Sequence, residues 1–199
     1  MIKNVIFDCG QVLIRYNETE IAAHYVDNSE DAELLGRVGM ARKYWNRFDE
    51  GTLLEADYLE MVKKELPERL HTAVEQLVNG WISCCPMITG MPEIVLDVKK
   101  SGKKLYLLSN FNKRLRTEPY PILKEFDALV ISGEINKVKP NRAIYEYLLS
   151  EYQLNPEECI FIDDNPANIA MGESLGIKGY LFDGDAGKLR AYLKTQAIL

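Results

Sequence analysis

Four short groups of polar residues lie at or just beyond the ends of apolar runs, and their types suit the binding of a metal ion and a phosphate. The groups are Asp8, the pair Ser109 and Asn110, Lys139, and the pair Asp163 and Asp164. Three carboxylates brought into one crevice would repel one another strongly unless a cation neutralised them, and all-oxygen ligands suit Mg²⁺. Lys139, the Ser109 hydroxyl and the Asn110 amide could then hold the oxygens of an anion beside that metal. A phosphate fits this set best.

Each group has a plainer explanation when it is taken alone. An aspartate at the end of a strand often caps a helix or a turn, and a Ser-Asn pair is ordinary loop chemistry. The adjacent acids Asp163 and Asp164 carry more weight, because two acids at the mouth of a buried strand are costly without a partner. The joint placement of all four groups, in order and at equivalent strand ends, favours a functional site.

The elements that must position these groups are strands alternating with helices. Residues 2–8 contain the unbroken run Val5, Ile6 and Phe7, which is typical of a strand buried on both faces. Similar runs predict strands over 105–108, 128–131, 160–162 and 180–182. Helix-like stretches separate them over 92–101, 113–124 (interrupted by Pro119 and Pro121), 140–152 and 166–175. This alternation predicts an α/β fold with a doubly wound, Rossmann-like parallel sheet, in which ligands bind beyond the carboxyl ends of the strands.

Helix boundaries are marked by local signals. Asn165 and Pro166 have the pattern of an N-cap followed by a first-turn proline, and Gly176 is a suitable C-terminal stop. The pair Lys139 and Pro140 predicts another helix start, which would place Lys139 beside the positive end of that helix.

Residues 18–82 interrupt the alternation, because their apolar residues recur at helical spacing. The spacing predicts about four helices, carrying Ile21 and Tyr25; Leu34, Val38, Ala41 and Trp45; Leu54, Tyr58, Val62 and Leu66; and Leu70, Val74, Leu77 and Trp81. Thr52 with Glu55 three residues later has the pattern of a capping box for the third helix. We expect a four-helix bundle inserted after the first strand.

Composition limits the possible partners and compartment. The chain of 199 residues has 24 Lys and Arg against 30 Asp and Glu, and its net charge of −6 disfavours nucleic acid and anionic membranes as partners. The first residues lack the pattern of a signal peptide, and no apolar run is long enough to span a membrane. The four cysteines, two of them adjacent, do not suggest a disulfide framework or a zinc site. We expect a reduced, cytoplasmic protein that is a monomer or a weak homodimer.

The four groups and their flanking residues resemble, in order and spacing, the four motifs of the haloacid dehalogenase (HAD) superfamily of hydrolases. The resemblance rests on residues 7–13 (FDCGQVL), 107–110 (LLSN), 139–140 (KP) and 161–165 (FIDDN). Residues 16–85 resemble the C1-type cap of subfamily I, which leaves 1–15 and 86–199 as the core domain. The Asp-x-Gly opening and the Asp-Asp-Asn-x-x-Asn ending are most similar to a branch that includes α-glucose-1-phosphate phosphatases and the phosphatase domain of epoxide hydrolases.

The resemblance implies a Mg²⁺-dependent phosphatase acting on a small phosphorylated metabolite, expected to be a sugar phosphate. Asp8 would attack phosphorus and form an aspartyl-phosphate. The metal ligands would be Asp8, Asp164, the Gly10 carbonyl and, through water, Asp163. Ser109, Asn110 and Lys139 would hold the phosphoryl oxygens, and Lys139 would offset the charge on Asp8. Substrate choice would lie in the cap and its hinge, with candidates Arg15, Tyr16, Asn17, Arg42, Trp45 and Arg47, although the helical spacing of Trp45 favours a place in the cap core.

Position 10 departs from the family pattern. Most phosphatases of the family have a second aspartate there, which protonates the leaving oxygen and later activates water, whereas this chain has Gly10. General acid–base help is typically worth about 10²–10⁴-fold in rate. The chain is therefore expected to be a slow phosphatase, to take its acid from elsewhere (His24, Asp49, Glu50 or solvent), or to bind phosphometabolites without turnover in a regulatory role. Dehalogenation is a weaker alternative, because the dehalogenases of the family carry a tyrosine at this position.

Overall fold

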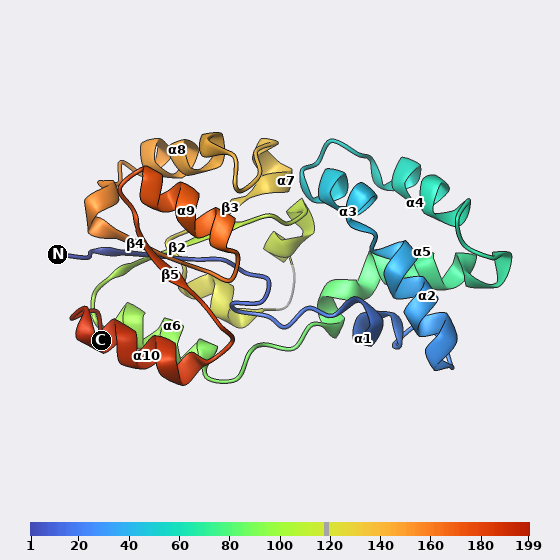
Figure 1. Cartoon of the computed structure of the whole chain (residues 1–199), viewed down its shortest axis with the longest axis horizontal. Coiled ribbons are helices and arrows are strands. Elements are labelled where there is room, and N and C mark those ends of the chain that lie inside the picture. The colour runs from blue at the N-terminus through green and yellow to red at the C-terminus, as the bar shows by residue number, and fades with distance from the viewer. Residues whose placement is uncertain (118–119) are drawn as a thin grey trace.

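The computed structural model describes residues 1–117 and 120–199, and it contains one five-stranded sheet with a separate group of helices beside it (Figure 1). The strands are β1 (Asn4–Phe7), β2 (Lys104–Ser109), β3 (Ala128–Ile131), β4 (Cys159–Asp163) and β5 (Lys178–Leu181). Their order in the sheet is β3-β2-β1-β4-β5, and every neighbouring pair is parallel. The predicted doubly wound α/β fold is confirmed, and β5 begins two residues before the predicted run.

Helices cover both faces of the sheet, which explains the unbroken apolar runs (Figure 1). The helices are α6 (Met91–Lys100) and α10 (Ala186–Thr195) on one face, and α8 (Arg142–Glu151) and α9 (Pro166–Ser174) on the other. Side chains alternate along each strand. Val5 and Phe7 therefore pack in the core on the side of α6 and α10, and Ile6 packs in the core on the side of α8 and α9.

The helix starts differ in how well the local signals predicted them. Asn165 caps α9 as expected, because its side chain accepts the Ala167 N–H at 2.9 Å, and Gly176 follows the helix at a φ of 88°. The prediction that Lys139 and Pro140 begin a helix is wrong. Asn141 is the N-cap of α8, and its side chain accepts the Ala143 N–H.

The segment between β2 and β3 contains no long helix in its described residues. It forms two short 3₁₀ helices, η3 (Lys113–Thr117) and η4 (Pro121–Glu125), in place of the stretch predicted over 113–124. Pro119, which was expected to interrupt that stretch, lies outside the described residues. A short helix α7 (Ser132–Ile135) follows β3, and η5 (Pro156–Glu158) precedes β4.

The insertion after β1 has five α-helices instead of the four predicted. They are α1 (Glu18–Ala22), α2 (Ser29–Gly39), α3 (Arg42–Asp49), α4 (Glu55–Lys63) and α5 (His71–Gly80), with short 3₁₀ helices η1 (Glu68–Leu70) and η2 (Trp81–Cys84). The helix predicted through Leu34 and Trp45 breaks at Met40 and Ala41, because α2 packs on α1 and α5 whereas α3 turns towards α4 and α7. We use "cap" for residues 16–85, a boundary that stays a prediction.

The capping box predicted for Thr52 and Glu55 is also wrong. Leu54 precedes α4 without a side-chain cap, and the Thr52 hydroxyl instead donates to the Arg47 carbonyl at 3.2 Å. Thr52 thus closes the turn after α3.

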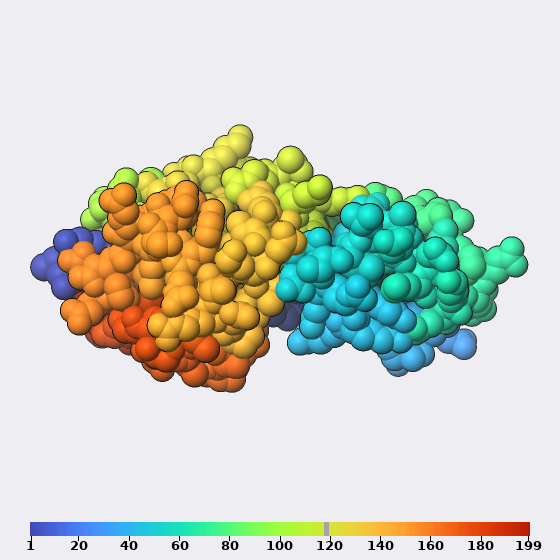
Figure 2. Space-filling view, turned by 90° about the horizontal axis from the view of Figure 1, so that it is seen from above, coloured from blue at the N-terminus to red at the C-terminus, as the bar shows by residue number. Residues whose placement is uncertain are grey.

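The cap and the sheet form two adjoining lobes, seen from above in Figure 2. Apolar contacts join them, because Trp81 of the cap stacks on Phe111 after β2 with ring centroids 4.9 Å apart. Polar contacts join them as well: the Ser132 hydroxyl donates to the Asp49 carbonyl at 2.7 Å, and the Asn136 amide donates to the Glu50 carbonyl at 3.0 Å. In the described part of the chain, none of the helices combines the length and the apolarity needed to cross a membrane.

Candidate active site

The carboxyl ends of the central strands bring three of the four sequence motifs together. Asp8 follows β1 directly, Ser109 is the last residue of β2, and Asp163 is the last residue of β4. Phe7 of β1 pairs with Leu107 of β2 on one side and with Ile162 of β4 on the other. The polar residues that follow therefore emerge at one edge of the sheet.

Lys139 joins two of these carboxylates through a buried ammonium group. Its Nζ lies 2.8 Å from Asp8 Oδ1 and 2.7 Å from Asp163 Oδ2, and its side chain is only 1% exposed. Burial opposes the charge on Lys139, yet Asp8 and Asp163 hold its pKa above the ordinary value. The lysine is therefore a permanent cation at the site.

Asn110 fixes the backbone of Lys139. The Asn110 Oδ1 accepts the Lys139 N–H at 2.7 Å, and its Nδ2 donates to the Lys139 carbonyl at 2.8 Å. Both functions of the amide are thus occupied by one residue 29 positions away in the chain. In this structure Asn110 positions Lys139, and it also lines the pocket described below.

Asp163 is fully buried and well supplied with donors. Besides Lys139, it accepts the Asn165 N–H at 2.8 Å and the Asn168 side-chain amide at 3.0 Å. The side-chain bond explains the asparagine at position 168, whereas Asn165 gives Asp163 only its backbone N–H and uses its side chain to cap α9. The carboxylate, held by these donors, orients Lys139.

Asp8, Asp163 and Asp164 form an acidic cluster in which one oxygen from each lies within 4.8 Å of the others. Burial raises the pKa of Asp8 to about 6, although Lys139 opposes that shift. Partial burial and the charge of Asp163 also raise the pKa of Asp164. Lys139 alone therefore does not balance the negative charge of Asp8 and Asp164, so a further cation would stabilise the cluster. Because its ligand atoms are all oxygens, the cluster fits Mg²⁺.

Gly10 lies at the same edge with open space beside it. An added Cβ at this position would meet no heavy atom within 4 Å, and φ is not in the left-handed region. The turn continues through Gln11, whose N–H donates to the Ile14 carbonyl at 2.8 Å. The absence of a side chain at position 10 is therefore not imposed by crowding.

A pocket of about 240 Å³ extends from these groups to the cap. On the core side it is lined by Asp8, Gly10, Gln11, Asn110, Phe111, Lys139, Asp164, Asn165 and Asn168, and on the cap side by Tyr16, Glu18, Met40, Arg42, Trp45, Asn46, Asp49 and Trp81. The cap side is rich in aromatic rings. The pocket therefore offers charge at one end and flat apolar surfaces at the other.

Some of the residues predicted from the sequence lie away from this pocket. Arg15 is exposed, pairs with Glu20 at 2.7 Å, and lines a neighbouring depression beside Asp164. Ser109 is buried with 1% exposure and is not among the lining residues. Arg47 is not among them either, and the His24 ring instead contacts the Glu20 carbonyl at 2.9 Å.

Trp45 lies both in the cap core and on the wall of the pocket, the two positions considered for it from the sequence. The side chain is 5% exposed and packs against Phe48, Tyr58 and Trp81, so it belongs to the cap core. It also lines the pocket. Sequence reasoning missed Trp81 and Phe111 as lining residues, because their apolar spacing indicates only that they are buried.

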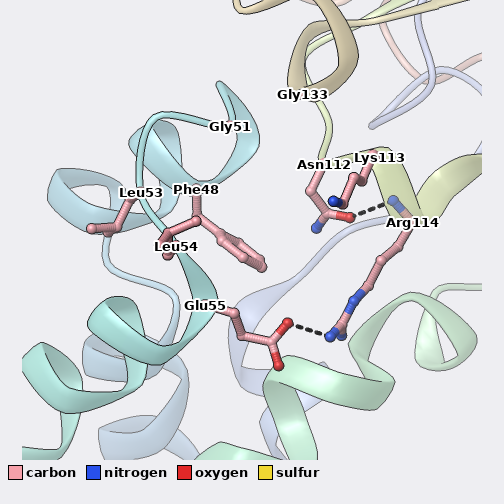
Figure 3. Close-up of a pocket in the computed structure, with 9 residues that line it drawn as sticks. All are labelled: Phe48, Gly51, Leu53, Leu54, Glu55, Asn112, Lys113, Arg114 and Gly133. Carbon is pink, nitrogen blue, oxygen red and sulfur yellow. Dashed lines mark hydrogen bonds and ion pairs between the residues drawn. The ribbon is translucent and has the colours of Figure 1, made fainter.

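A second pocket, of about 280 Å³, lies between cap and core beside η3 (Figure 3). Phe48, Leu53 and Leu54 line it from the cap, and the Phe48 ring points towards Asn112 and Arg114 of the core. Arg114 forms an ion pair with Glu55 and donates to the Val78 carbonyl at 2.9 Å. These Arg114 contacts join cap and core at this second pocket, whereas Asp8 and Asp164 of the acidic cluster line the first one.

Comparison with known proteins gives consistent similarities. A family model described as haloacid dehalogenase-like hydrolase matches residues 2–176. The chain is 25% identical to D-ribitol-5-phosphate phosphatase from Bacteroides thetaiotaomicron, over 90% of this chain and 91% of that protein. It is also 25% identical to a sesquiterpene phosphatase from Aspergillus oryzae, over 89% of this chain and 88% of that protein.

Among solved structures, a HAD family enzyme from Bacteroides thetaiotaomicron in complex with magnesium and inorganic phosphate has a similar fold. The TM-score is 0.75 with 20% identity, over 95% of this chain and 99% of that chain. At this identity the likeness supports the fold, and it extends over both the sheet and the inserted helices.

Proposed function

Because this chain belongs to the haloacid dehalogenase-like hydrolases, as a phosphatase-like hydrolase of that family, we propose that it removes phosphate from a small phosphorylated metabolite through an intermediate on Asp8. The observation that carries the proposal is the contact of Lys139 Nζ with Asp8 Oδ1 at 2.8 Å, at the edge of the acidic cluster. A nucleophilic carboxylate beside a buried cation is the arrangement that attack on a phosphate dianion requires.

Mg²⁺ is the proposed cofactor. Asp8, Asp164 and the Gly10 carbonyl would hold it, and when bound it would neutralise charge on the phosphoryl oxygens. Asp163 would act on the metal only through water, because Lys139, Asn165 and Asn168 already contact its oxygens. The similar solved structure is a complex with magnesium and inorganic phosphate, which supports this choice of cofactor.

The protein's own groups bind and orient the phosphate in this mechanism. Asp8 forms a bond to phosphorus, the bond from phosphorus to the substrate oxygen breaks, and water later releases phosphate from Asp8. Lys139 stabilises the charge on the phosphoryl group, while Asp163 and Asn110 keep the lysine in place. Catalysis in such reactions is mostly positioning and charge neutralisation.

The proposed substrate is a sugar or polyol phosphate. Trp45, Trp81, Tyr16 and Phe111 provide flat surfaces on which a carbon skeleton can pack, and polar side chains such as Gln11 and Asn46 can bind hydroxyl groups. The relative named as a ribitol phosphate phosphatase supports this class. A pocket of about 240 Å³ suits a small metabolite.

The test is phosphate release from p-nitrophenyl phosphate and a panel of sugar and polyol phosphates, with Mg²⁺ and with EDTA. We expect turnover that needs Mg²⁺ and that Asp8→Asn abolishes. Activity that survives in Asp8→Asn would remove the aspartyl-phosphate mechanism. Binding of a panel member without release would instead favour the phosphometabolite-binding role that Gly10 suggests.

A further inference from the structure

The proposed reaction needs a proton for the leaving oxygen, and the residue two positions after Asp8 cannot supply it because it is Gly10. The inference below rests on the proposed function. Four carboxylates line the pocket: Asp8, Asp164, Glu18 and Asp49. Asp8 and Asp164 belong to the acidic cluster, so the candidates for an acid lie on the cap.

Asp49, the last residue of α3, differs from the other three in its surroundings. Its Oδ1 is buried and has no hydrogen-bond partner among the described residues. A carboxylate with a bare oxygen is unstable, whereas a protonated carboxyl group tolerates the same place. The environment therefore favours the neutral acid, which is the form that can donate a proton.

The groups around Asp49 lead to the same conclusion. Burial raises its pKa well above the ordinary value, and the nearby Asn112 backbone N–H and Trp45 side chain only partly oppose this. The titratable groups that face it from neighbouring elements are the hydroxyls of Tyr16 and Tyr58, which are neutral at physiological pH. The charged groups elsewhere on the pocket wall are Asp8, Glu18, Arg42, Lys139 and Asp164.

The backbone of Asp49 is fixed to the core although the residue belongs to the cap. Ser132, the first residue after β3, donates its hydroxyl hydrogen to the Asp49 carbonyl at 2.7 Å. Ser132 and Asp8 both follow parallel strands of one sheet, so this bond holds the end of α3 at the edge where Asp8 emerges. The adjoining Asn136–Glu50 bond of 3.0 Å gives a second anchor.

Other possible proton donors are less suitable. His24 is exposed and does not line the pocket. Glu50 does not line it either, and its Oε2 lies 3.2 Å from the Thr52 hydroxyl oxygen. Burial and the charges of neighbouring acids raise the pKa of Tyr16, which makes its hydroxyl a poor proton donor.

We propose that Asp49 is the general acid and base of this enzyme, supplied by the cap in place of a side chain at position 10. As Asp8 bonds to phosphorus and the ester bond breaks, the electron pair of that bond passes to the leaving oxygen, which takes the proton of Asp49. A water oxygen then attacks phosphorus and gives a proton to the Asp49 carboxylate. The bond from phosphorus to Asp8 breaks, and its electron pair returns to the Asp8 oxygen.

The test uses two substrates that differ in their need for an acid. An activated aryl phosphate leaves as a stable phenolate, whereas a sugar or polyol phosphate leaves as an alkoxide that must be protonated. Asp49→Asn should lower kcat/KM, which reports the steps up to departure of the leaving group, by about 10²-fold or more on the polyol phosphate and by less than about threefold on the aryl phosphate. Glu50→Gln, the adjacent carboxyl group outside the pocket, should leave both rates unchanged.

A rescue variant separates proton transfer from a structural role. The space beside Gly10 admits a side chain. The double variant Gly10→Asp with Asp49→Asn should therefore turn over the polyol phosphate at least about tenfold faster than Asp49→Asn alone. A purely structural role of Asp49 would slow both substrates equally and would not be rescued. Either of those results overturns the proposal.

The wild-type enzyme provides a readout that does not depend on a variant folding. The pH profile of kcat/KM should have a descending alkaline limb with the polyol phosphate, as Asp49 loses its proton, and no such limb with the aryl phosphate. Identical profiles for the two substrates would contradict the proposal. If the wild type releases no phosphate from either substrate, the proposed function fails instead, so the two failures are distinguishable.

Discussion

Lys139 Nζ lies 2.8 Å from Asp8 Oδ1, and the lysine side chain is almost completely buried. The contact joins a residue after β1 to one that lies between β3 and α8, 131 positions later in the chain. A buried ammonium group is stable only when it is paired, so the lysine and the carboxylates depend on one another. The same contact therefore stabilises the buried charge of Lys139 and takes part in the proposed chemistry.

Replacing Lys139 with methionine should damage both properties. Breaking a buried ion pair by removing one partner costs about 3–5 kcal/mol, and the loss should be smaller at pH 5, where more of Asp8 is protonated. Phosphate release should fall by about 10²-fold or more. Urea unfolding at the two pH values measures the first effect, with Lys137→Met, two residues away, as a control that should change stability by less than about 0.5 kcal/mol.

The raised pKa of Asp8 predicts that Asp8→Asn stabilises the metal-free protein at neutral pH. The folded state raises this pKa from 3.8 to about 6, so it binds a proton more tightly than the unfolded chain does. The stability of the metal-free wild type should therefore fall as the pH rises from about 4 to about 6. The Asp8→Asn variant has no carboxylate at this position and should not lose stability over this pH range. Denaturant unfolding in EDTA should therefore show the variant to be more stable than the wild type at pH 7 and equally stable at pH 4.

Asp127 provides a control of opposite sign. Burial opposes its charge, but the Leu105 N–H, Lys104 and Lys99 lower its pKa to about 2. Its contribution to stability is therefore present at pH 7 and is lost as the pH falls towards that value. Asp127→Asn should be less stable than the wild type at pH 7. Equal behaviour of the two variants would refute the assignment of the raised pKa to Asp8.

Gly10→Asp should fold and should change the wild-type rate little. The position has space for a side chain, so the melting temperature should stay within a few degrees of the wild type. If Asp49 already supplies the proton, a second acid should change kcat on a polyol phosphate by less than about threefold. A large rise in that rate would show that the wild type lacks an acid.

Ser132→Ala should loosen the attachment of the cap. Its hydroxyl is buried, donates to the Asp49 carbonyl at 2.7 Å and accepts the Phe111 N–H at 2.9 Å, and the variant leaves both backbone groups without that partner. We expect a loss of about 1–3 kcal/mol in urea unfolding. Hydrogen exchange should become faster at the end of α3. Ser150→Ala, at an exposed site on α8, should change neither measurement.

The sequence predicted well those features that depend on a short local pattern. Unbroken apolar runs indicated the strands because parallel strands are buried on both faces, and Asn165 was identifiable as a cap because it bonds to the backbone two residues on. Predictions failed where distant contacts overrule local signals. The helix predicted through Leu34 and Trp45 breaks because α3 packs against α4 and α7, and Thr52 closes the turn after α3 in place of capping α4.

The residues of the candidate site likewise include some that a local pattern identified and some that it did not. Asp8, Asp163, Asp164 and Lys139 were identifiable because each has a fixed offset from a strand or belongs to a short motif. Arg15 was selected for its charge, but its partner is Glu20 and it lies outside the pocket.

The sequence alone determined which polar residues follow each strand. Because parallel strands place their carboxyl ends at one edge of the sheet, it also determined which charges could meet there. It could not determine which cap acid lines the same pocket as Asp8, because that depends on how α3 packs against the core. Asp49 is one acid among 30 Asp and Glu residues in the sequence. Only the tertiary structure gives it a buried oxygen without a partner and a place on the wall of the pocket, because burial and docking arise from contacts between distant segments.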